Sequence, residues 1–236
     1  MHMATRGVLG HSLGFTHKPN SDEQFAFAMG IDACTLPAGG MLQQFLMNIA
    51  IEQWPRRHLI NVDEYYRMAE VGLLAPNARV ELIEGEVVDI GPIGSKHADM
   101  VDHLSTLLIR TTSDRALVGV QRPVRLDERS EPQPDLVLLK PKPGRYRNAH
   151  PTSADVLLLI EVSDTTLKFD LGQKLSLYAQ HGITEVWVVD LENNQLHQMR
   201  EPDGASYRTA TIMKAPQIAA VSALPDVHVE LAALFP

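Results

Sequence analysis

The 236-residue sequence contains a single cysteine, Cys34. One cysteine excludes an intrachain disulfide and a cluster of thiolate metal ligands, and it suits a reducing compartment. Long hydrophobic runs are also missing. The one apolar stretch near the N-terminus, residues 41–51, is much shorter than the about 20 residues that cross a bilayer, and it is interrupted by Gln43, Gln44 and Asn48. We therefore expect a cytoplasmic protein without a secretory signal or a membrane anchor.

Positive charge is scarce, since 21 Lys and Arg residues stand against 29 Asp and Glu residues and give a net charge of −8. Binding to a phosphate backbone needs clustered Lys and Arg, so this balance argues against broad nonspecific affinity for nucleic acids. A local basic patch remains compatible with it. Otherwise the composition, with 44% hydrophobic and 21% charged residues, is ordinary for a globular protein.

The N-terminal quarter of the chain lacks a clear pattern. Gly, His, Ser, Pro and Asn dominate the first twenty residues, and a short helix is plausible only over 41–51. One expectation is that translation of the native protein starts at Met41 or Met47, so that much of this segment lies outside it. We expect a poorly determined N-terminal extension over residues 1–57 and one domain over residues 58–236.

Two short apolar runs carry the candidate site. Residues 135–139 and 156–162 are rich in leucine and β-branched residues and are bounded by Pro, Gly, Ser and Asp, which predicts two buried strands. If these sequence neighbours pair antiparallel, Asp135 lies opposite or close to Glu161, at about 5 Å. Two carboxylates that close need a cation or a proton between them. The pattern therefore indicates a site for a divalent metal with oxygen ligands.

A helix after the second run supplies a lysine. Asp170 suits the N-cap, Gln173 the capping-box position, and Gly182 the end of this helix. Its apolar face would pack on the sheet through Leu171, Leu175, Tyr178 and Ala179. Lys174 lies on the flank of that face, where it either extends to water or reaches the carboxylates.

The remaining patterns predict an α/β fold with a central mixed sheet flanked by helices. Helices are expected over 61–70, capped by Asn61 or Asp63, and over 95–113. Strands are expected over 80–83, 86–90, 118–120, 124–126, 185–190, 196–199 and 207–212, with a closing strand or helix over 227–235. The basic segment 140–147 begins at the far end of the first site strand, so it would contact a nucleic acid only by folding back or with a long substrate.

The order and spacing of these residues resemble the Uma-two family of endonucleases, which belongs to the PD-(D/E)xK restriction-endonuclease-like superfamily. The matching elements are PD at 134–135, EVS at 161–163, D-x-x-x-K-x-x-x-Y-A-x-x-G at 170–182 and EVWVVD at 185–190. Upstream, ELIEGE at 81–86 is similar to the E-L-I-(D/E)-G-E element that opens the family's sheet. The similarity begins near Val62 and extends almost to the C-terminus.

This resemblance implies a restriction-endonuclease-like core and a DNA endonuclease that uses Mg²⁺ or Mn²⁺. The implied metal ligands are Asp135, Glu161 and the backbone carbonyl of Val162. Glu81 is implied as a further ligand, direct or through water, with Glu84 as the alternative. In its mechanism the metal polarises the scissile phosphate and activates a water molecule.

The sequence departs from the superfamily pattern at one position. Ser163 occupies the place of the lysine in the ExK motif, so the resemblance implies that Lys174 acts from the following helix. His97 is implied only as a residue that contacts a ligand. A homodimer would suit an enzyme that cuts both strands.

Two other functions fit the same residues. A catalytically inactive nuclease fold that binds nucleic acids or another partner would agree with Ser163 and with the acidic charge. A metal hydrolase acting on a small phosphoester would need a closed pocket in place of an open cleft. Binding of a divalent metal separates the first alternative from a nuclease, and preference for polymeric substrates separates the second.

Overall fold

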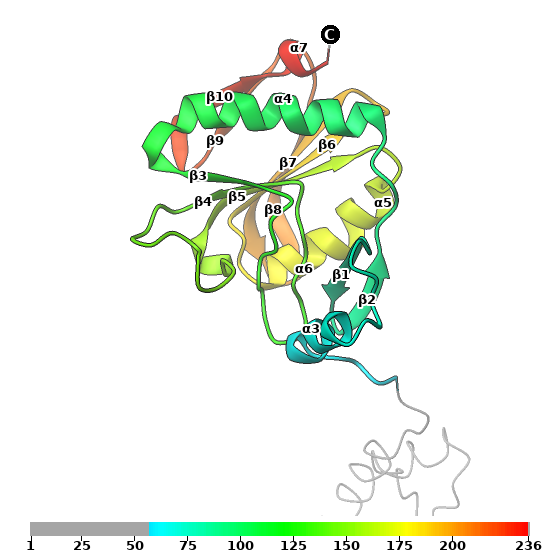
Figure 1. Ribbon diagram of the computed structural model, residues 1–236. Helices are drawn as coiled ribbons and strands as arrows, with labels where there is room; N and C mark the ends of the chain where they lie inside the picture. Colours follow the sequence, from blue (N-terminus) through cyan, green and yellow to red (C-terminus); the bar gives the residue numbers. More distant parts are fainter. Residues whose placement is uncertain (1–56, 236) are drawn as a thin grey trace, which may run out of the picture. The chain divides into compact units, whose positions relative to one another are not determined.

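The computed structural model describes residues 57–235, and its core is a six-stranded sheet with the order β3-β4-β5-β6-β7-β8 (Figure 1). The strands are β3 (Leu117–Val120), β4 (Leu136–Leu139), β5 (Val156–Ser163), β6 (Glu185–Asp190), β7 (Gln195–Asp203) and β8 (Ser206–Met213). Strands β5 and β6 are parallel, and the other neighbouring pairs of this sheet are antiparallel. The predicted mixed sheet is confirmed.

Helices cover both faces of this sheet because its strands are apolar on both sides (Figure 1). In β4, Leu136 and Leu138 pack with helix α4 (Ser95–Thr112), whereas Val137 and Leu139 belong to the core on the opposite face. The second helical layer consists of α5 (Leu167–Phe169), η4 (Asp170–Lys174) and α6 (Leu175–Gln180). The core on the side of the sheet that α4 covers also includes residues of β9 (Ile218–Val221), β10 (Leu224–Glu230) and α7 (Leu231–Leu234). Short 3₁₀ turns, η2 (Ser113–Arg115) and η3 (Ser153–Asp155), complete the described elements. No helix within residues 57–235 is both long and apolar enough to cross a membrane.

A separate hairpin carries the first acidic motif. Strands β1 (Val80–Ile83) and β2 (Glu86–Asp89) pair antiparallel beside helix α3 (Val62–Glu70). Of the two expected caps of this helix, Asn61 is the one that the structure shows, in a capping box with Glu64. Gly85 forms the turn at φ +83°, and a Cβ atom there would lie only 2.7 Å from Leu59 Cβ, so only glycine fits. All four β1 residues are buried, and this burial brings the Glu81 side chain inward.

Three expectations from the sequence are wrong or incomplete. Residues 124–126 are not a strand, since Arg125 forms only an isolated bridge with Thr152. Segment 227–235 contains both a strand end and a helix, and β9, which pairs with β10, is not predicted by the sequence patterns. The predicted extension and its helix at 41–51 lie outside the described residues, so the boundary after residue 57 stays a prediction.

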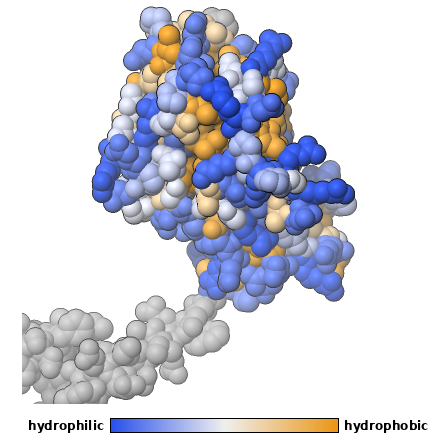
Figure 2. All heavy atoms as spheres, turned by 90° about the vertical axis from the view of Figure 1, so that its left-hand side faces the viewer, coloured by the Kyte–Doolittle hydropathy of each residue, from blue (hydrophilic) through white to orange (hydrophobic). Residues whose placement is uncertain are grey.

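Strand β3 is an edge strand of the six-stranded sheet. Figure 2 shows one face of the molecule, on which apolar residues gather in the upper middle part among polar ones. Val118 of β3 is half-buried and Val120 is 47% exposed. The structure describes one chain, so the homodimer remains a prediction.

Candidate active site

Asp135 and Glu161 meet at the end of the antiparallel pair β4 and β5. The register pairs Leu136 with Ile160, so Asp135, directly before β4, reaches the level of Glu161. Asp135 Oδ2 accepts a hydrogen bond of 2.9 Å from the backbone N–H of Val162. It also lies 3.1 Å from Nε2 of His97, in the first turn of α4. The structure thus brings Asp135, Glu161 and Val162 together, and it places His97 on Asp135.

Lys174 joins the site from the opposite helical layer. Its ammonium Nζ lies 2.9 Å from Glu161 Oε1 and 3.1 Å from Glu81 Oε2, and it donates a hydrogen bond of 3.2 Å to Glu81 Oε1. All three side chains are nearly inaccessible, with residue exposures of 3%, 3% and 4% for Lys174, Glu161 and Glu81. Of the two positions open to the lysine, the structure shows the one that reaches the carboxylates.

The charge of this cluster is out of balance. Burial is the largest influence on Glu161 and, with Asp170 and Asp135 adding to it against Lys174, raises its pKa to about 8. Burial also raises the pKa of Glu81, although Lys174 opposes it. Burial alone would lower the pKa of Lys174, but Glu161 and Glu81 raise it above its usual value. The single positive charge of Lys174 is therefore shared by two buried carboxyl groups, those of Glu161 and Glu81.

The predicted role of Asp170 as N-cap is wrong. The helical segment begins at Leu167, after Thr166, so Asp170 lies inside it, at the start of a π-helical turn that extends to Lys174. The Asp170 side chain is buried and accepts hydrogen bonds from Ser163 Oγ at 2.7 Å and Thr166 Oγ1 at 2.6 Å. Bonding across to β5 replaces the expected bond to the helix backbone. Single π turns often occur at functional sites, and this one lies directly before the lysine.

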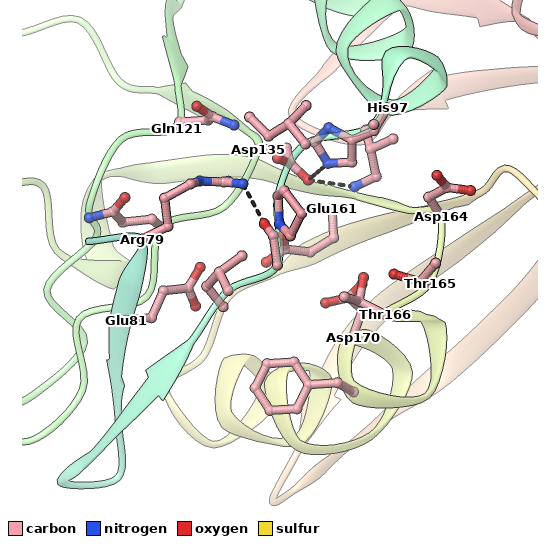
Figure 3. A pocket seen from close by; sticks show the side chains of 18 of the residues that line it. Arg79, Glu81, His97, Gln121, Asp135, Glu161, Asp164, Thr165, Thr166 and Asp170 are labelled. Carbon is pink, nitrogen blue, oxygen red and sulfur yellow. Dashed lines mark hydrogen bonds and ion pairs between the residues drawn. The ribbon is translucent and has the colours of Figure 1, made fainter. Parts of the chain in front are cut away.

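These side chains line the base of a cleft of about 380 Å³. Figure 3 shows Asp135, Glu161 and Asp170 facing it, with Asp164 and Thr165 on one side and Arg79 on another. The walls come from segments far apart in sequence, including the loop between β2 and α4. Sequence patterns did not indicate Arg79 as part of the site, because only the tertiary fold brings β1 to this position.

Two alternatives from the sequence lie elsewhere. Glu84 is exposed, and its Oε2 accepts a hydrogen bond of 3.1 Å from Gln173 Nε2, so Glu81 is the β1–β2 acid that reaches the site. Two lysines of the basic segment 140–147 bond near η3: Lys140 Nζ donates to the Ala154 carbonyl and Lys142 Nζ pairs with Asp155 at 3.2 Å. These lysines therefore do not contact the cluster.

The donor set fits a divalent cation in chemistry. Within residues 57–235 no three His, Cys, Asp or Glu side chains converge as a ready metal cage. However, Glu81 Oε2 is buried and accepts no hydrogen bond of good geometry, although Lys174 Nζ lies 3.1 Å away, and the carboxyl groups of Glu81 and Glu161 share this one lysine. Carboxylate oxygens and a backbone carbonyl are the ligands that Mg²⁺ prefers. Asp135, Glu161 and the Val162 carbonyl are the atoms that would hold it.

Tyr178 is a site residue that the sequence patterns assign only to packing. Its hydroxyl donates a hydrogen bond to Glu161 Oε1 from α6. Burial, with Glu161 and Glu81 adding to it, raises the pKa of Tyr178 well above its usual value, so the hydroxyl keeps its proton. Its position four residues after Lys174, on the same side of a helix, is the signal that could have indicated this contact.

Comparisons with known proteins bear on the family and the fold of this chain. A family model, Uma2, described as "Putative restriction endonuclease", matches residues 62–233. A solved structure described as a putative nuclease belonging to DUF820, from Anabaena variabilis ATCC 29413, is similar with a TM-score of 0.59 at 15% identity, over 75% of this chain and 97% of that one. No curated protein matches significantly. The structural likeness confirms the fold, and the family model covers most of the chain: the protein belongs to the Uma2 family of restriction-endonuclease-like proteins.

Proposed function

We propose that this chain is a metal-dependent endonuclease that hydrolyses phosphodiester bonds of DNA. The observation that supports the proposal best is the buried cluster of Asp135, Glu161, Glu81 and Lys174 at the base of a cleft. Burying acids that share one lysine is costly, and a fold without a function for them could replace them by apolar residues. Family membership supports the nuclease class.

The proposed metal site consists of Asp135, Glu161 and the Val162 carbonyl, with Glu81 as a further ligand or a ligand through water. A bound Mg²⁺ would supply positive charge for the phosphate and lower the pKa of a water molecule. The N–H of Val162 and His97 orient the carboxylate of Asp135. Orientation by such contacts decides how well a carboxylate can bind a metal.

Lys174 has two roles in this mechanism. In the structure its positive charge balances the negative charge of Glu161 and Glu81. If a second cation balanced the charge of Glu161, the ammonium group of Lys174 would be free to donate a hydrogen bond to a phosphate oxygen or to the attacking water in the cleft. Charge held ready in a buried site stabilises a transition state more strongly than charge in water. This proposal transfers the function of the missing ExK lysine to Lys174.

Cleavage is expected to need a divalent metal. Wild-type protein should cut plasmid and single-stranded DNA in Mg²⁺ or Mn²⁺ and should be inactive in excess EDTA, with activity restored by added metal. The assay also includes a small phosphodiester as substrate. Metal binding without cleavage of any substrate would indicate an inactive fold, and cleavage of the small substrate alone would indicate a phosphoesterase.

Metal binding is expected to release a proton at pH 7. A carboxylate must be ionised to bind a metal, and the pKa of Glu161 without metal is raised to about 8. The apparent affinity for Mg²⁺ should therefore fall as the pH drops below 8, by roughly tenfold per pH unit for one proton, and should level off above pH 8. Calorimetry in phosphate and in Tris buffer measures the proton through the different heats of buffer ionisation. Equal heats in both buffers, with an affinity that does not depend on pH, would contradict this prediction.

A further inference from the structure

Tyr178 lies behind the site and is completely buried. It belongs to α6 and does not line the cleft, so a substrate cannot contact it. Its hydroxyl nevertheless donates to Oε1 of Glu161, a proposed metal ligand. A packing role alone requires no hydroxyl, because phenylalanine fills almost the same volume.

Both donors to Glu161 act on the same oxygen atom. Lys174 and Tyr178 approach Oε1, and no other described side chain donates a hydrogen bond to this carboxylate. No hydrogen bond from a described side chain to the second oxygen, Oε2, is found, and Glu161 is one of the residues that line the cleft. The two contacts therefore fix the rotation of the carboxylate group.

These two donors differ in what else they can do. Lys174 also bonds Glu81, and in the proposed mechanism it serves the phosphate or the water. Tyr178 is held in the core by the packing of α6 on the sheet and has no second acceptor among the described residues. It is the contact that stays when Lys174 leaves.

We infer that Tyr178 is a positioning residue, which keeps Glu161 in the orientation that binds the metal while Lys174 acts on the substrate. The inference rests on the proposed function, since it assigns Tyr178 a role toward the same metal. Residues that orient a ligand in this way typically change metal affinity or activity by about 10- to 100-fold.

The test is Tyr178→Phe in the full-length protein, with Mn²⁺ binding measured by calorimetry. The affinity is expected to fall by about 10-fold or more, because the carboxylate loses the donor that fixes it. KM for DNA should stay unchanged, since Tyr178 does not line the cleft, and kcat at limiting Mn²⁺ should fall. Saturating Mn²⁺ should restore most of kcat. A merely structural role would change the melting temperature without this dependence on metal.

Tyr207→Phe is the matched control. Tyr207 is a tyrosine of the same core whose hydroxyl donates to the backbone carbonyl of Ile183 at 2.8 Å, away from the cleft. This variant should bind Mn²⁺ as the wild type does. Equal Mn²⁺ affinity in Tyr178→Phe and the wild type would overturn the inference and leave the proposed function standing. Wild-type protein that binds no Mn²⁺ would overturn both.

Replacement of Tyr178 by 4-aminophenylalanine gives a second variant, because it returns an N–H donor to the same position. Mn²⁺ affinity within about threefold of the wild type is expected, and this result keeps the test decisive if Tyr178→Phe does not fold. A loss as large as that expected for the Phe variant would contradict the inference.

Discussion

Asp135→Asn is expected to abolish DNA cleavage without unfolding the protein. Asparagine keeps the size of the side chain and an oxygen that can accept from the N–H of Val162, but it removes the charge that holds a metal. Loss of metal-based stabilisation, worth several kcal/mol, corresponds to a decrease in kcat of about 1,000-fold or more. Because Asp135 adds to the repulsion that raises the pKa of Glu161, the melting temperature should stay the same or rise.

Cleavage kinetics and thermal melting of the same samples check this prediction. Asp190→Asn is the control, since Asp190 is a carboxylate at the end of β6, more buried than Asp135, that accepts hydrogen bonds from Asn193 and Gln195 outside the cleft. It should keep wild-type cleavage. Activity of Asp135→Asn above about a tenth of the wild-type value would remove Asp135 from the proposed site.

Of the variants considered, Lys174→Met is expected to have the largest decrease in the free energy of unfolding. Methionine retains the apolar part of the side chain but leaves Glu161 and Glu81 buried without their cation. Removing one partner of a buried ion pair typically costs about 3–5 kcal/mol. Cleavage should be lost as well, since no other lysine lines the cleft within the described residues.

The loss of stability in Lys174→Met should depend on pH with a defined sign. Glu161 and Glu81 have raised pKa values in the folded protein, so the stability linked to their protonated forms is fully present below pH 4.5 and is lost as the pH rises through their folded values. The pKa of Lys174 is raised above 10.5, so its own contribution in the wild type is constant from pH 5 to pH 9. The difference in melting temperature should therefore be larger at pH 8 than at pH 5.

Lys142→Met is the control for this experiment. Lys142 forms a partly exposed ion pair with Asp155, and such surface pairs contribute about 0–1 kcal/mol. Its melting temperature should stay close to that of the wild type at both values of pH. A Lys174→Met variant as stable as this control would show that the cluster carries no uncompensated charge.

The neighbouring positions of Asp135 and Glu161 follow from local patterns. Two neighbouring apolar runs predicted an antiparallel pair, and the periodicity of strands then fixed which acids meet. The flank position of Lys174 left its direction open, and only burial in the structure shows that it points to the carboxylates. The place of Glu81 in the site was implied only by the family resemblance, because nothing in the sequence of its own strand indicates that its side chain points toward Asp135 and Glu161.

Other parts of the site depend on long-range packing that a sequence does not display. Asp170 is of a residue type that favours N-caps, but its Oδ2 accepts hydrogen bonds from the hydroxyl groups of Ser163, in β5, and Thr166. These side-chain bonds replace the expected bond to the helix backbone. The π turn depends on the same contacts. Arg79 reaches the cleft only because the β1–β2 hairpin returns to the sheet. Local preferences thus predict that a helix or strand forms, whereas tertiary contacts decide at which residue it begins and which side chains reach the site.

On the proposed function, the two helical layers on opposite faces of the sheet would also decide when a folding chain acquires a complete site. His97 comes from α4 on one face, whereas Lys174 and Tyr178 come from η4 and α6 on the other. A folding intermediate in which only one layer has docked lacks one of these groups. On the proposed function, a newly made chain could not damage nucleic acids until both layers are in place, so the arrangement of the fold would itself protect the cell from premature cleavage.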